Sequence, residues 1–334
     1  MFNKLSPTPI TNKTHRSLLI FTMIWFFSGA WIDSSAHTYL IDDIETFFTP
    51  WHGVLYSGYI FSALVVMYIK NTMKDYKFDV GVLGAVIFGI GGASDAIWHT
   101  LLGIETGVEP LITPSHLLLF LGAFLMLDYI FTTRPSKERL DNASIFSAAT
   151  SYGLVLFITL FINPFLNIWT FIRRDDELAA GSVILQAMLA SFIFIYVIRF
   201  KVSPKQMSSI YLISFIYISI NTSLGELDRT LLICFSGLIM SAFIYQITKW
   251  YQTTNHDRKI QISAALVAGS YGLVFVLHLL VFSGLNEIEL SWRFYGLGGL
   301  VTTPILFGYM LGNLGVSPTS VSYTHLTLPT MIRV

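Results

Sequence analysis

Two short stretches of this chain contain one aspartate and two histidines in the same order. The residues are Asp33, His37 and His52 in the first stretch and Asp95, His99 and His116 in the second. The second set begins 62 positions after the first. One carboxylate and two imidazoles form a mixed oxygen and nitrogen donor set of the kind that transition metals accept. The repetition predicts two sets of metal ligands.

The spacing inside each set predicts helices that bring the three side chains together. Asp33 and His37 are four positions apart, as are Asp95 and His99, and this spacing stacks both side chains on one helix face. A Thr-Pro pair precedes the last histidine of each set, which indicates the start of a new helix because threonine is a good N-cap and proline suits the first turn. Three ligands with an open position suit Cu(II) or Zn(II), whereas Ca²⁺ and Mg²⁺ prefer more oxygens.

Two alternatives are open for the same six residues. An Asp–His hydrogen-bond network would join the hairpins without a metal, and a relay would pass protons or substrate. A lone histidine at a helix start is usually a cap, but four of the eight histidines fall within the two copies, which favours a ligand role. His278 would add an imidazole if it reached the site, although a hydrogen-bonded core histidine is the simpler interpretation.

Composition predicts a membrane protein. The chain has 334 residues, of which 54% are hydrophobic and 12% charged, whereas a soluble domain has about 25% charged residues. Zero net charge argues against a nucleic-acid partner, and a single cysteine excludes a disulfide framework. We expect an all-α polytopic bundle in the lipid bilayer with about ten spans, near 17–36, 51–70, 80–102, 114–133, 143–163, 180–200, 207–223, 229–249, 260–283 and 292–313.

Charge predicts the orientation of these spans. Fifteen of the twenty Lys and Arg residues lie in the N-terminal segment and in the loops expected on the same side. By the positive-inside rule that side is cytoplasmic, so we expect a cytoplasmic N-terminus in the inner (plasma) membrane. Both Asp/His/His sets would then lie at the outer, periplasmic face.

The pattern also predicts how the chain is organised. Residues 1–133 form a duplicated two-span hairpin unit, and residues 143–316 form a second helical unit. The string Ser151–Val155 recurs as Ser270–Val274, and the same offset relates Arg174 to Arg293, which indicates the start of a truncated repeat. The polar, Thr-rich residues 317–334 resemble translated sequencing adapter, so we expect an artefactual tail on a fragment.

The order Asp-x3-His followed by Phe-Thr-Pro-x-His resembles the copper-binding motif in one membrane subunit of the particulate copper monooxygenases, which oxidise methane or ammonia. Here the approach to His52 is Phe48-Thr49-Pro50-Trp51. The resemblance implies that both sets bind copper, whereas the donor set by itself also suits zinc. We therefore expect an integral membrane protein that binds a transition metal at its outer face. An alternative implied by the resemblance is a subunit of a membrane oxidoreductase that works with other membrane subunits. A transporter is a further possibility, since internal repeats are typical of that class.

Overall fold

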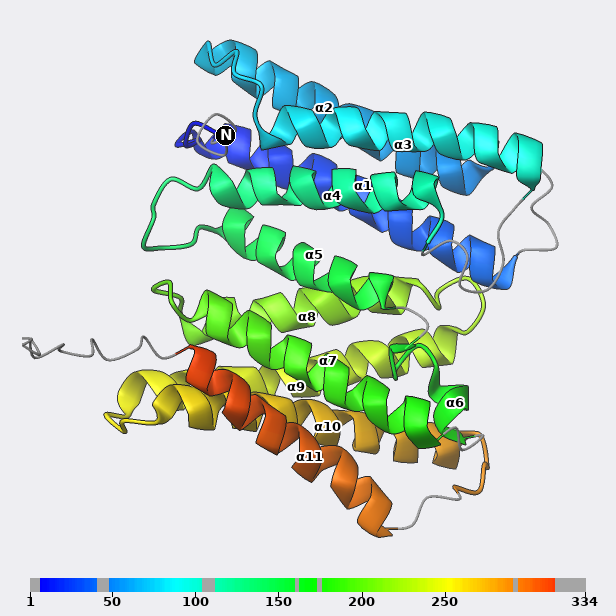
Figure 1. Ribbon diagram of the computed structural model, residues 1–334, viewed down its shortest axis with the longest axis vertical. Coiled ribbons are helices and arrows are strands. Elements are labelled where there is room, and N and C mark those ends of the chain that lie inside the picture. The colour runs from blue at the N-terminus through cyan, green and yellow to red at the C-terminus, as the bar shows by residue number, and fades with distance from the viewer. Residues whose placement is uncertain are drawn as a thin grey trace, which may run out of the picture.

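The computed structural model describes residues 7–40, 48–103, 112–159, 162–172, 176–290 and 294–315, and within these ranges all regular structure is helical. The long helices lie side by side along one general direction (Figure 1). Eight of them are long and apolar enough to cross a membrane. For the described part of the chain, the prediction of an all-α polytopic bundle is confirmed.

Each predicted span corresponds to one long helix. Two of these, α5 and α8, have 17 residues each, which is the lower limit for crossing the hydrocarbon core. The five-residue α6 was not predicted. In chain order the helices are α1 (Lys13–Tyr39), α2 (Pro50–Met73), α3 (Val80–Leu102), α4 (Pro114–Thr132), α5 (Asn142–Ile158), α6 (Ile168–Ile172), α7 (Asp176–Val197), α8 (Pro204–Ile220), α9 (Leu227–Thr253), α10 (Lys259–Leu285) and α11 (Phe294–Leu314).

Helix α5 ends earlier than its apolar run predicted. The run extends to residue 163, but the helix ends at Ile158. Asn163 then forms a turn in which its Oδ1 accepts a hydrogen bond from the Phe165 N–H at 3.1 Å. Pro164 follows it and has no N–H to continue a helical ladder. Asn163 and Pro164 therefore keep the end of the apolar run from being helical, which hydropathy does not register.

The first hairpin, α1 with α2, is joined by a close helix crossing. A Cβ added at Gly29 of α1 would lie 2.8 Å from the Cα of Leu55. A Cβ added at Gly58 of α2 would lie 2.6 Å from the Cα of Phe26. One glycine on each helix therefore allows the two backbones to touch, and any larger residue would separate them.

The second hairpin, α3 with α4, crosses through residues at matching positions. A Cβ added at Gly91 would lie 2.9 Å from the backbone N of Leu119, and one added at Gly122 would lie 2.5 Å from the backbone N of Phe88. The α3 residues lie 62 positions after their α1 counterparts, and the α4 residues lie 64 after theirs in α2. The correspondence between the Asp/His/His sets thus extends into the packing that positions them.

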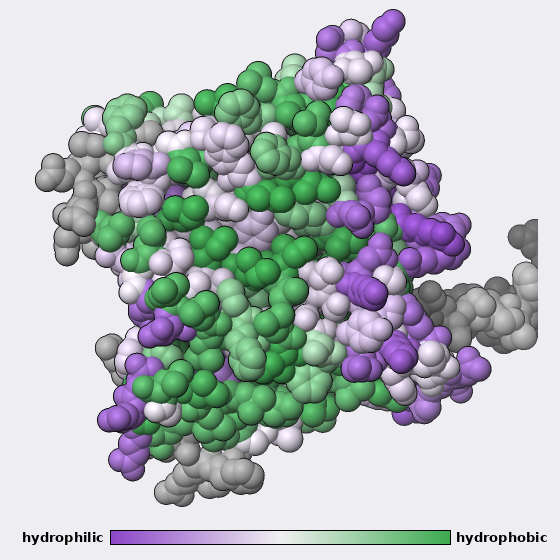
Figure 2. Space-filling model, turned by 180° about the vertical axis from the view of Figure 1, so that it is seen from behind, coloured by the Kyte–Doolittle hydropathy of each residue, from purple (hydrophilic) through white to green (hydrophobic). Residues whose placement is uncertain are grey.

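Buried apolar residues form two clusters. One belongs mainly to α1–α4, and the other mainly to α5 and α7–α11, with α5 contributing to both. Large apolar side chains such as Leu64, Met67 and Leu231 are exposed instead of buried. Figure 2 shows hydrophobic residues over the middle of one face and hydrophilic residues gathered towards the helix ends. This distribution fits a protein whose sides contact lipid.

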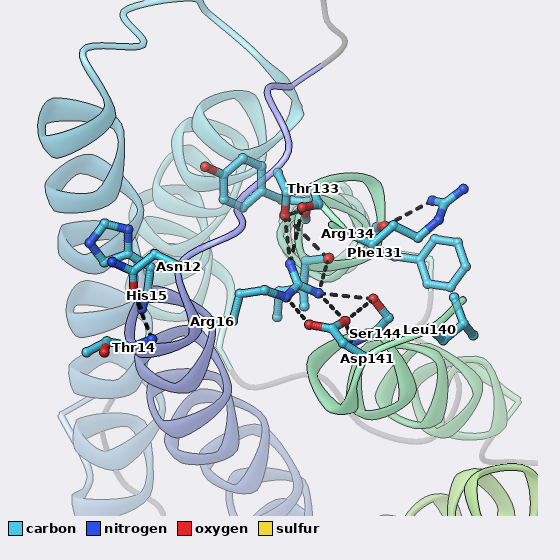
Figure 3. Close-up of polar contacts among 12 residues, drawn as sticks. Asn12, Thr14, His15, Arg16, Phe131, Thr133, Arg134, Leu140, Asp141 and Ser144 are labelled. Carbon is cyan, nitrogen blue, oxygen red and sulfur yellow. Dashed lines mark hydrogen bonds and ion pairs between the residues drawn. The ribbon is translucent and has the colours of Figure 1, made fainter. Parts of the chain in front are cut away.

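A buried arginine joins three helices at the end of α1 opposite to Asp33. Arg16 forms an ion pair with Asp141, the N-cap of α5, and its Nη2 donates to Ser144 Oγ at 3.0 Å (Figure 3). The same guanidinium donates to the carbonyl oxygens of Ile130 and Thr133 at the end of α4. The start of α1 is therefore fixed to α4 and α5.

Candidate metal centre

The first Asp/His/His set converges from the two helices of the first hairpin. Asp33 and His37 lie one turn apart near the end of α1, and His52 lies in the first turn of α2. His37 Nε2 is 3.5 Å from His52 Nε2 and 3.9 Å from Asp33 Oδ2. His52 Nε2 is 3.6 Å from Asp33 Oδ1. The structure therefore brings all three predicted residues together.

The second set converges in the same way in the second hairpin. Asp95 and His99 lie near the end of α3, and His116 lies in the first turn of α4. Asp95 Oδ1 is 3.5 Å from His99 Nε2 and 3.7 Å from His116 Nε2. In each set the three candidate ligand atoms lie within 4.8 Å of one another. Among the described residues, these are the two groups of His, Cys, Asp or Glu with this arrangement.

The separations between the candidate ligand atoms are longer than ordinary hydrogen bonds. An N–H···O bond usually spans about 2.7–3.2 Å. Two atoms that each bind one ion at about 2.0–2.1 Å in a tetrahedral arrangement lie roughly 3.4 Å apart. In addition, the Oδ1 atom of Asp33 is buried without a hydrogen-bond partner. A buried carboxylate oxygen without a partner is costly, and an ion bound between the three side chains would remove that cost.

The Thr-Pro pairs position the last histidine of each set. Thr49 and Thr113 are the N-caps of α2 and α4, and each is followed by proline in the first turn, as the sequence predicted. Thr49 Oγ1 lies 3.2 Å from His52 Nδ1, and Thr113 Oγ1 lies 2.8 Å from His116 Nδ1. When the hydroxyl accepts the Nδ1–H, the Nε2 lone pair faces the set, which is the tautomer that a metal ligand needs.

The two sets lie next to each other. The ring centroids of His37 and His99 are 6.2 Å apart with the rings stacked, and those of His52 and His99 are also 6.2 Å apart. The Tyr56 hydroxyl, one turn after His52 on α2, faces Asp95 Oδ2 across the hairpin boundary at 3.5 Å, a long polar contact. Each set belongs to one hairpin, but the six residues form one continuous cluster.

The end of α1 that carries Asp33 is fixed to the second half of the chain. Asn221 Nδ2 donates to Ser34 Oγ at 2.6 Å, and the Leu224 N–H donates to Ser35 Oγ at 3.2 Å. One turn further, the Tyr39 hydroxyl donates to Glu226 Oε1 at 3.3 Å. These contacts orient the helix, so that Asp33 and His37 face α2 instead of the lipid.

Other residues singled out in the sequence do not join this cluster. His278 is buried in α10, where its Nδ1 lies 2.9 Å from Ser236 Oγ and its ring packs edge-on against Phe165. It is therefore a hydrogen-bonded core histidine, as the simpler interpretation held. Arg174, Arg293 and the segment 317–334 lie outside the described residues.

Two contributions to the site were not predicted from the sequence. The hydroxyls of Thr49 and Thr113 contact the imidazoles as well as the helix starts, and Tyr56 reaches the opposite hairpin. The four-residue spacing between His52 and Tyr56 was a signal for a shared helix face. The assembled geometry offers two adjacent three-ligand positions.

No protein-family model matches the chain, and no curated protein or solved structure matches it at a significant level.

Proposed function

We propose that this chain is a polytopic membrane protein that binds one transition-metal ion at each Asp/His/His set, with copper as the favoured ion and zinc as the second. The observation that carries the proposal is the convergence of one carboxylate and two imidazoles, with separations of 3.5–3.9 Å between facing atoms. A metal-free Asp–His network would instead draw the pairs to within about 3.2 Å.

The donor atoms narrow the choice of ion. Imidazole with carboxylate suits Cu(II) and Zn(II), and a set of two histidines and one carboxylate also occurs with Fe(II). Copper stands first because the motif resembles the copper-binding motif of the membrane monooxygenases. Three protein ligands leave a position for water, oxygen or substrate, as in catalytic sites, whereas structural zinc sites use four protein ligands.

Metal analysis of the purified protein tests this proposal. We expect two equivalents of metal in the wild type after loading with Cu(II). The pair His37→Ala/His52→Ala should remove one equivalent, and His99→Ala/His116→Ala should remove the other. His256→Ala is the matched control, because His256 is exposed between α9 and α10, far along the chain from both sets. Absence of copper, zinc and iron from a folded wild type would refute metal binding, and iron alone would correct the ion.

A second candidate function is that of one component in a membrane oxidoreductase. It is favoured by the open position in each set and by the adjacency of the two sets, because ions bound at neighbouring sets could act on one substrate. Oxygen consumption by membranes that contain the protein and its neighbouring gene products tests it. Activity that disappears in Asp33→Asn and Asp95→Asn supports a catalytic role. Bound metal without oxygen-dependent turnover leaves metal binding in place and rejects this function.

A further inference from the structure

Tyr56 connects the two sets through a contact that joins one hairpin to the other. Its ring lies beside His52 on α2, with centroids 6.0 Å apart, while its hydroxyl lies 3.5 Å from Asp95 Oδ2 on α3. Gly92 of α3 allows this approach, since an added Cβ there would lie 2.6 Å from Tyr56 Cε1. A residue of the first hairpin therefore reaches the carboxylate of the second.

The matching position in the second hairpin lacks the hydroxyl. Tyr56 lies four residues after His52, and the residue four after His116 is Phe120. The Phe120 ring packs beside His116 in the same way, with centroids 6.5 Å apart, and against Phe157 of α5. The two hairpins thus differ by one oxygen atom at this position, and the hydroxyl that Tyr56 provides contacts Asp95.

The two aspartates face their histidines differently. Asp95 directs one oxygen, Oδ1, at both imidazoles of its set, with His99 at 3.5 Å and His116 at 3.7 Å. Its other oxygen faces Tyr56. Asp33 instead faces His37 with Oδ2 and His52 with Oδ1. The carboxylate that has a hydroxyl partner offers a single oxygen to its set, and the other carboxylate divides its two oxygens between the imidazoles.

We propose that Tyr56 is a positioning residue for the second set, which holds Asp95 so that one oxygen binds the ion, and that the two sets are therefore unequal in metal affinity and ligand geometry. This inference rests on the proposed metal binding. At 3.5 Å the hydroxyl faces the carboxylate at the long limit of a hydrogen bond, and binding of an ion that orders Asp95 would shorten this contact. Removal of such a polar partner from a ligating carboxylate commonly lowers metal affinity about 10- to 100-fold. The first set, with no hydroxyl from Phe120, does not depend on this contact.

The test measures Cu(II) affinity of each set separately by competition with a chelator. The second set is isolated in the His37→Ala/His52→Ala background, and the first in the His99→Ala/His116→Ala background. Tyr56→Phe should weaken the second set about 10- to 100-fold and leave the first unchanged. The Cu(II) electron paramagnetic resonance spectrum of the second set should change as well, because Asp95 gains freedom to bind through both oxygens.

Tyr59→Phe is the matched control. Tyr59 lies on the same helix interface, where its hydroxyl donates to the Ala85 carbonyl at 2.7 Å, so the change removes one hydroxyl and one contact between α2 and α3. Gly92→Ala is a second probe, which displaces the Tyr56 ring and leaves its hydroxyl intact. Equal affinities of Tyr56→Phe and Tyr59→Phe at the second set would overturn the inference. A wild type that binds no metal would instead reject the proposed function itself.

Discussion

The glycines at the two hairpin crossings give the sharpest test of how the fold positions the metal sets. An alanine at 122 would place its Cβ 2.5 Å from the Phe88 backbone N, whereas ordinary contact begins at 3.4 Å. Helix α4 would have to move away from α3 by about 0.9 Å, which exceeds the roughly 0.5 Å within which a ligand set must be held. His116 lies on the same helix as Gly122, so it would move with it.

The size of the effect follows from this displacement. Overpacking of a close contact costs about 1–3 kcal/mol. Metal binding would have to draw α4 back toward α3 against that strain. The expected loss of affinity at the second set is roughly 5- to 150-fold, the ratio that corresponds to 1–3 kcal/mol. Gly58→Ala, with its Cβ 2.6 Å from the Phe26 Cα, should have the same effect on the first set only.

Metal stoichiometry and chelator competition, together with thermal unfolding in detergent, measure these effects. Gly53→Ala is the control, because it lies beside His52 but has no atom within 4 Å of an added Cβ. In a helix, that change should stabilise the protein by about 0.5–1 kcal/mol. The reasoning is refuted if Gly122→Ala behaves like Gly53→Ala, or if each crossing variant weakens both sets equally.

Three further predictions concern the opposite end of the bundle. Arg16→Met should lower the free energy of unfolding by about 1–3 kcal/mol, because it leaves the partly buried Asp141 carboxylate without its ion-pair partner. Thermal unfolding measures this loss, and recovery in the double variant with Asp141→Asn is the check. Burial alone would raise the pKa of Asp141, but hydrogen bonds from Arg16 and Ser144 hold it below its ordinary value of 3.8. Stabilisation by Asp141 is therefore complete above pH 3.8 and is lost as the pH falls through the lower folded-state pKa. The melting temperature should depend less on pH across this range in Asp141→Asn than in the wild type. Glu138→Gln, which changes an exposed carboxylate, should keep the pH dependence of the wild type. Lys70→Met should lower the free energy of unfolding by about 3–5 kcal/mol, because Lys70 Nζ lies 2.6 Å from Asp79, which is fully buried. A melting temperature equal to that of the wild type would contradict this.

Much of the fold follows from patterns that extend over one helix. Hydropathy predicts the long helices, because an apolar segment in lipid must satisfy its backbone N–H and C=O groups internally and a helix does so. The Thr-Pro pairs predict the starts of α2 and α4. The four-residue spacing of Asp33 and His37 predicts a common face, which the structure shows. Each of these features depends only on residues within a few turns of one another.

The features that sequence patterns missed depend on contacts between distant elements. Nothing near Tyr56 indicates that its hydroxyl meets Asp95, because the contact depends on how α2 packs against α3. The pairing of Arg16 with Asp141 likewise depends on where α5 lies relative to α1. The turn formed by Asn163 within the predicted fifth span is likewise a side-chain effect that apolar periodicity does not contain.

The pairing of Arg16 with Asp141 sets an order for assembly during synthesis. The two residues are 125 positions apart, so α1 to α4 are made before the partner of the arginine exists. The crossings at Gly29 and Gly91 need only the helices of their own hairpins, so both hairpins can pack while the start of α1 is still free to move. An arginine without a partner is costly inside a bilayer and would remain near its surface until then. Asn221 and Glu226, which contact the opposite end of α1, are made later still. The contacts of α1 with the second half of the chain are therefore the ones that complete the membrane bundle.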